Sequence, residues 1–141
     1  MKKRLILKVL GLLLLLPMFS GCNDTDDVAG IFTGKTWKLT YITVKDSHQL
    51  FKFWGNDNKA REQSMKLLDE TGRYVITFNG MEESNIITGT LSGTVITSTF
   101  TGSWSANGKD NQFNASIQAG KESSDILAKN FIEGLNNATS Y

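Results

Sequence analysis

The stretch from Ser84 to Gly108 contains no charged side chain. It is rich in threonine, serine, β-branched and aromatic residues, which favour strands. Ser92-Gly93 divides it with a turn signal, so we predict two strands, residues 85–91 and 94–104, joined as a hairpin. Exposed sheet edges are usually guarded by charges. We therefore expect both strands to lie inside a sheet or around a closed barrel.

Three further segments have the composition and alternation of strands, and they are residues 36–44, 73–79 and 112–119. The pair Asn79-Gly80 favours a turn after the second segment, and Asn107-Gly108 favours a turn before the third.

Two segments have helical periodicity. The first runs from Asp57 to Glu70, where Asn56 or Asp57 can cap it, and the second begins at Ser124 or Asp125. A single helix over a curved antiparallel sheet is the simplest way to bury both faces of the sheet. We therefore predict an α+β fold, mainly antiparallel β: a curved sheet or open barrel of about five strands, with one helix after the first strand and one C-terminal helix.

Residues 1–21 have the character of a secretory signal peptide. Lys2, Lys3 and Arg4 precede an apolar run that is shorter than the roughly 20 residues of a membrane span. Ser20-Gly21-Cys22 resembles the lipobox of bacterial lipoproteins. The resemblance implies cleavage before Cys22 and attachment of acyl chains, such as palmitate, to that residue. Cys22 is the only cysteine of the chain, and lipidation would account for it.

Residues 22–33 are expected to form an acidic tether, because Asp24, Asp26 and Asp27 are unsuited to a core. Acidic residues at this place also resemble the surface-export signal of lipoproteins in Bacteroidota-type bacteria, and a plain linker is the alternative. We expect a protein of the cell envelope that Cys22 anchors to the outer membrane, surface-exposed if the export signal operates.

Charge argues against nucleic acid as a partner. The chain has 15 Lys and Arg residues and 14 Asp and Glu residues. Without the four basic residues among the first eight, 11 basic residues face 14 acidic ones, a net charge of −3. Phosphate binding needs a basic face. The 120 residues from Cys22 onward suit one domain with one core.

No set of residues suggests catalysis. His48 is the only histidine, and its neighbours Asp46 and Ser47 cannot form a relay with it, because adjacent residues of an extended chain point to opposite faces. We predict that His48 lies in a surface loop. Metal-ligand spacing is also missing. The prediction is a protein that is not an enzyme and holds no cofactor or metal.

The segment Gly34-Lys35-Thr36-Trp37-Lys38-Leu39 resembles the opening of META/HslJ-type envelope domains, an opening also seen in lipocalin-like lipoproteins of gut Bacteroidota. Phe131-Ile132-Glu133-Gly134-Leu135 and Tyr141 resemble the META helix and the tyrosine after it. META-type domains continue past that tyrosine with one or two strands. The resemblance therefore implies a single META/lipocalin-like domain over residues 34–141 that is shortened or C-terminally incomplete, with an unpaired sheet edge.

Aromatic residues are the best candidates for ligand binding, and they are Trp37, Phe51, Phe53, Trp54 and Trp104. The alternative is that these side chains form the core. We expect an envelope protein that acts through protein contacts or in envelope maintenance. The alternative function is a lipocalin-like carrier that binds a small hydrophobic ligand within the curved sheet. In the ligand-binding interpretation, Phe51, Phe53 and Trp54 line a mouth over the sheet for an apolar or sugar ligand.

Overall fold

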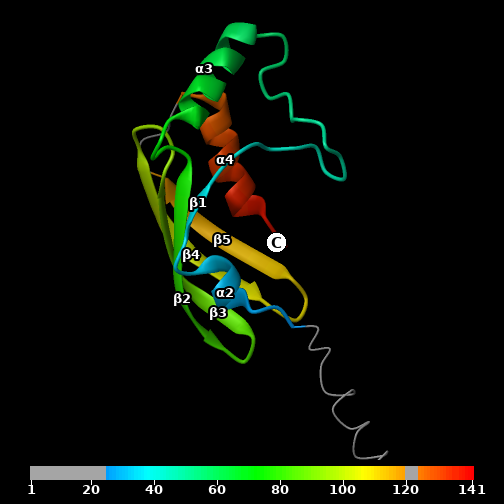
Figure 1. Cartoon of the computed structure of the whole chain (residues 1–141), viewed down its shortest axis with the longest axis vertical. Helices are drawn as coiled ribbons and strands as arrows, with labels where there is room; N and C mark the ends of the chain where they lie inside the picture. Colours follow the sequence, from blue (N-terminus) through cyan, green and yellow to red (C-terminus); the bar gives the residue numbers. More distant parts are fainter. Residues whose placement is uncertain (1–24, 120–123) are drawn as a thin grey trace, which may run out of the picture.

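The computed structural model describes residues 25–119 and 124–141 (Figure 1). Its elements are α2 (Val28–Phe32), β1 (Thr36–Lys38), α3 (Asn58–Asp69), β2 (Val75–Glu83), β3 (Ile86–Thr94), β4 (Thr99–Asn107), β5 (Gln112–Ala119) and α4 (Ile126–Asn137). The strands form one open antiparallel sheet in the order β1-β2-β3-β4-β5. This confirms the predicted fold class. The predicted signal peptide and Cys22 lie outside the described residues.

The uncharged strands β3 and β4 lie in the interior of the sheet, as their lack of guarding charges predicts. The turns around them differ from the prediction. Ser84-Asn85, with φ of 54° and 67°, joins β2 to β3, and residues 95–98 join β3 to β4. Asn79-Gly80 and Ser92-Gly93 lie within strands instead.

The glycines of these strands serve packing and not turns. Gly80 pairs with Gly89 across β2 and β3. A Cβ atom on Gly89 would lie 1.9 Å from the backbone oxygen of Asn79. Trp104 pairs with Gly89 from β4, and its indole N–H donates to the same oxygen at 3.1 Å. Gly89 is therefore required by the close approach of the strands beside Trp104.

The two faces of the sheet differ in polarity. Alternate residues on one face belong to the buried core, including Ile76, Phe78, Ile87, Leu91, Phe100, Trp104 and Phe113. The other face is exposed and carries hydroxyl groups, including those of Thr88, Thr90, Ser92, Thr101 and Ser103. The expectation that both faces are buried is therefore wrong, because threonine and serine make the outer face polar without charge.

Two helices cover the core face at its two ends (Figure 1). Phe131 of α4 meets Tyr74 and Phe100 edge-on, with ring centroids 5.9 and 6.2 Å apart. Phe32 of α2 lies 5.1–5.6 Å from four other rings, those of Phe78, Trp104, Phe113 and Tyr141. The side chains of both helices thus occupy the space over the core face.

The domain begins earlier than expected, because α2 falls inside the predicted tether 22–33. Val28 is fully buried and Phe32 is 8 % exposed. The Asp27 carboxylate caps α2 by accepting from the Gly30 N–H at 2.9 Å, and the Asp26 N–H donates to the Gly108 carbonyl at 2.9 Å. Burial of the apolar side chains of α2 draws this segment onto the sheet despite its acidic neighbours.

The first strand is shorter than the predicted residues 36–44. After the Leu39 N–H donates to the Tyr74 carbonyl, the chain leaves the sheet. Lys38 extends its ammonium to the C-terminal end of α3, where it donates to the carbonyls of Leu68, Glu70 and Arg73 at 2.5–2.9 Å. A cation is favourable there because the last carbonyls of a helix lack partners. Residues 40–56 therefore lie outside the sheet, beside α3.

Both predicted helix starts are confirmed. The Asp57 carboxylate accepts from the Ala60 N–H at 3.0 Å, and the Asp125 carboxylate accepts from the Ala128 N–H at the same distance.

The last turn of α4 and the chain after it cover part of the β5 edge. The Phe113 N–H donates to the Thr139 carbonyl at 3.0 Å, and the Ile117 N–H donates to the Asn136 side-chain oxygen at 2.7 Å. The edge that was expected to be unpaired therefore has partners at these two positions.

Candidate ligand-binding groove

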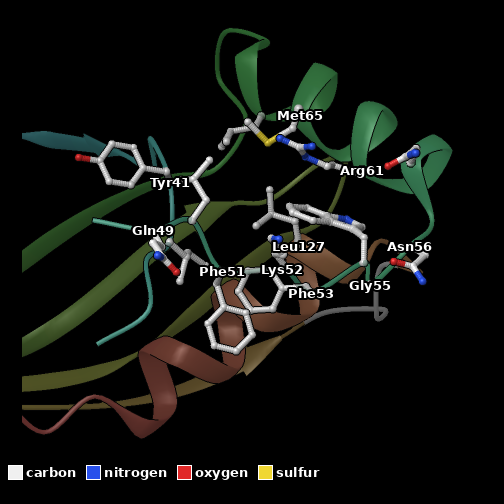
Figure 2. Close-up of a pocket in the computed structure, with 15 residues that line it drawn as sticks. Tyr41, Gln49, Phe51, Lys52, Phe53, Gly55, Asn56, Arg61, Met65 and Leu127 are labelled. Carbon is white, nitrogen blue, oxygen red and sulfur yellow. The ribbon is translucent and has the colours of Figure 1, made fainter. Parts of the chain in front are cut away.

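A groove of about 830 Å³ opens between α3 and the segment 41–56 (Figure 2). Leu68 of α3 and Leu127 of α4, which are 3 % and 2 % exposed, form its floor. Figure 2 shows Phe51 and Phe53 on one side of Leu127 and Met65 of α3 on the other. The groove therefore lies beside α3 at the end of the sheet and not over the middle of the packed core face.

Backbone hydrogen bonds shape the aromatic wall of the groove. Val44 donates to the Gln49 carbonyl and Phe51 donates to the Ile42 carbonyl, both at 2.9 Å, so residues 42–51 fold back as a small hairpin. The rings of Phe51 and Phe53 then stack with centroids 4.3 Å apart, and Phe53 meets Trp54 edge-on at 5.7 Å. Such a wall suits an apolar or ring-shaped ligand.

A hydrogen-bond network behind the groove holds Trp54 in place. The Trp54 indole N–H donates to the Ser64 hydroxyl at 2.9 Å, and that hydroxyl donates to the Asp125 carboxylate at 2.7 Å. The Tyr74 hydroxyl donates to the other oxygen of the same carboxylate at 3.0 Å. One network therefore joins the aromatic segment, α3, the start of β2 and the cap of α4, which makes the wall rigid.

The hydroxyl groups of this network are buried. Ser64 is 1 % exposed, so its hydroxyl has no surface for a substrate. Burial, together with the charge and hydrogen bond of Asp125, raises the pKa of the Tyr74 phenol, which therefore keeps its proton at neutral pH.

Comparison with protein families identifies the family of this chain. The family described as a domain of unknown function, DUF4847, matches residues 23–141. The chain belongs to the DUF4847 family. A search of curated proteins gives no match. The matched range agrees with the structure, in which α2 and Asp26 already belong to the domain. The resemblance to META/HslJ-type and lipocalin-like domains stays a prediction.

The DUF4847 structure brings together three of the five predicted ligand-binding residues, Phe51, Phe53 and Trp54, on one groove. The other two lie elsewhere. Trp104 is 3 % exposed in the core, and Trp37 is 41 % exposed on β1 with its indole N–H on the Phe32 carbonyl at 3.2 Å. The three groove residues are nearly consecutive in the segment before α3. Trp37 and Trp104 belong to strands β1 and β4.

The groove of this DUF4847 protein also contains residues that the sequence did not single out. Lys52 and Arg61 line it as its two charged residues, and Met65 lies one turn after Arg61 on α3. The spacing of Ser64, Leu68 and Met65 on the helix could have indicated which face of α3 turns inward. The position of Lys52 depends on the fold of the loop, which has no periodic signal.

Other kinds of site are not apparent in the part of the DUF4847 chain that the structure describes. Within residues 25–119 and 124–141, no three His, Cys, Asp or Glu side chains gather as metal ligands. His48 is exposed in the loop before Gln49, which confirms its predicted position. No helix among the described residues is both long and apolar enough to cross a membrane.

Proposed function

We propose that this DUF4847 protein is a non-enzymatic, lipid-anchored binding protein of the cell envelope whose groove takes a small apolar ligand. The observation that carries the proposal is the groove between α3 and the segment 41–56, with a stacked aromatic wall and a buried leucine floor. Its volume of about 830 Å³ lies in the range of small-molecule sites, roughly 300–1,000 Å³.

The rigidity of the groove supports binding of a ligand. Trp54 is fixed through Ser64 to Asp125, and among the described residues no buried side-chain polar atom lacks a hydrogen bond. A wall that is already ordered loses little conformational entropy when a ligand binds. The site proposed here differs from a lipocalin-like chamber, since core side chains occupy the space under the helices and the groove lies beside α3.

The proposed location rests on the sequence. The basic start, the apolar run and Ser20-Gly21-Cys22 support export and acylation of Cys22, with the outer membrane as the partner surface. Metabolic labelling with an alkyne-tagged palmitate would test this proposal. We expect label on the natural chain and none on Cys22→Ser, and label on both chains would remove the lipid-anchor proposal.

Replacement of Phe51 tests the groove. Phe51→Ala removes half of the stacked pair, while the ring is 44 % exposed and contributes little to the core. We expect loss of about tenfold in affinity for decan-1-ol, measured by equilibrium dialysis, with less than about 1 kcal/mol lost in stability. Trp54→Ala is less suitable, because it also removes the hydrogen bond to Ser64.

Ile86→Ala is the matched control, since Ile86 is 45 % exposed and lies outside the groove. It should bind decan-1-ol like the natural chain. No binding by the natural chain, or an equal loss in both variants, would argue against the apolar site.

The second candidate is a protein partner. Tyr41, Val44, Leu50 and Phe51 are all exposed on the segment 41–56, so they present an apolar surface beside the groove. Under this proposal Val44→Asp would abolish partner binding in cells and leave decan-1-ol binding unchanged, because Val44 does not line the groove. If Val44→Asp and the natural chain recover the same amount of partner after cross-linking in cells, the partner proposal is wrong.

A further inference from the structure

We propose that the ligand of the groove is an amphipathic anion, an apolar body that carries one carboxylate or a similar acidic headgroup. This inference rests on the proposed ligand-binding function and adds the charge of the ligand. Two cationic side chains, Lys52 and Arg61, line the groove, and no Asp or Glu is among its lining residues. The groove therefore has positive charge beside apolar surface.

Neither cation has a counter-charge in the described part of the chain. The ion pair found there joins Arg73 to Glu70 at 2.6 Å, far along the sequence from both. Two lysines elsewhere have partners, since Lys35 donates to the Gly30 carbonyl and Lys38 donates to three carbonyls at the end of α3. Lys52 and Arg61 make no such contact, so an anionic ligand would supply the missing partner.

Two acidic side chains lie close to Arg61 in the sequence, Asp57 and Glu62, and neither lines the groove. Asp57 follows the groove-lining Asn56, but its carboxylate accepts from the Ala60 N–H as the cap of α3 and does not line the groove. Among the described residues, no ion pair joins Asp57 or Glu62 to Arg61.

The arrangement of polar and apolar groups gives the ligand a direction. Leu68 and Leu127 are buried at the floor, whereas Lys52 and Arg61 are exposed at the opening. Figure 2 shows the Arg61 guanidinium reaching from α3 toward Met65. An alkyl chain or ring would lie on the floor against Phe53, and its headgroup would remain at the rim, where a guanidinium can bind a carboxylate through two hydrogen bonds.

Decanoate and decan-1-ol test the inference, because they share one alkyl chain and differ in headgroup charge. The full chain is dialysed in detergent micelles at pH 8 against the same micelles without protein, so that partition into detergent cancels. We expect decanoate to bind about tenfold more tightly than decan-1-ol. Equal affinities would overturn the anion inference and leave the apolar site standing. Retention of neither would overturn the apolar site and, with it, the inference.

Charge variants connect the selectivity to the two cations. Arg61→Gln and Lys52→Gln should each weaken decanoate binding about fivefold and leave decan-1-ol unchanged. Lys59→Gln is the matched control, because Lys59 is exposed on the same helix outside the groove, and it should change neither affinity. Arg61→Glu should bind decylammonium more tightly than decanoate. If Arg61→Gln weakens both ligands equally, the effect is on the fold and the inference fails.

Discussion

At the scale of single residues, Tyr74 shows how a buried hydrogen-bond network holds a residue in an unusual backbone conformation. It is fully buried, its φ of 52° lies in the left-handed region that bulky residues rarely adopt, and its hydroxyl donates to Asp125. Its N–H donates to the Val95 carbonyl at 2.9 Å, so the backbone on the strand side is also fixed. The surrounding contacts hold a conformation that the residue alone would not choose.

Stability should fall at alkaline pH because of Tyr74. Burial first, and then Asp125, raises the pKa of its phenol above the ordinary value of 10.0. Below pH 10 the folded and unfolded chains both keep the proton and stability is complete. Above pH 10 the unfolded chain loses the proton first, so the free energy of unfolding decreases as pH rises. Urea unfolding between pH 8 and pH 11 measures this decrease.

Tyr74→Phe should lose about 1–2 kcal/mol at neutral pH and have a flatter alkaline decrease. Tyr41→Phe, at a tyrosine that is 60 % exposed, serves as the control and should follow the natural chain. An alkaline decrease that is as steep in Tyr74→Phe as in the natural chain would assign it to other groups.

At the scale of elements, local signals predicted the helices α3 and α4 with their caps and strand β5, whereas tertiary packing decided the rest, including α2. Asp57 and Asp125 act within one helical turn, so their role is readable from the sequence. The pair Asn79-Gly80 has the composition of a turn, but Gly80 lies within β2 and packs closely against the backbone of β3. The aromatic wall was found because its residues are neighbours in the chain. The sequence does not single out Arg61, because the groove beside it exists only once the segment 41–56 has folded against α3.

Two glycine substitutions should have opposite effects. Gly89→Ala places a Cβ against the Asn79 carbonyl and should lose about 2 kcal/mol or more of stability. Gly134→Ala, on α4, meets nothing within 4 Å and should gain roughly 0.5–1 kcal/mol, because alanine favours a helix. Thermal and urea unfolding of both variants measures the difference. A Gly89→Ala variant as stable as the natural chain would contradict the close strand approach.

At the scale of the whole molecule, the N-terminal segment is fastened to one end of the sheet. The Asp26 carboxylate accepts from the Asn111 amide at 2.7 Å and from the Tyr141 hydroxyl at 3.1 Å. Three residues separate Cys22 from Asp26, a reach of roughly 14 Å at full extension. Helix α3, which lines the groove, lies at the opposite end of the sheet (Figure 1), roughly 25–30 Å away along nine-residue strands.

We expect the groove to point away from the membrane. Fluorophores at the two ends of the sheet test this expectation on the acylated protein in liposomes. With Cys22 acylated, a label on Lys109→Cys beside Asp26 should be quenched by lipids that carry a headgroup quencher. A label on Asn58→Cys at the groove should not be quenched. Equal quenching at both positions would show that the domain lies flat on the membrane.

The short link between Cys22 and Asp26 thus bears on the route of a ligand. Under the proposed acylation of Cys22, a domain that stands on the membrane at Asp26 would hold its far end away from the bilayer. Cargo would reach the groove from the aqueous side or by transfer from another molecule, and the supply of that cargo would not depend on the composition of the anchoring leaflet.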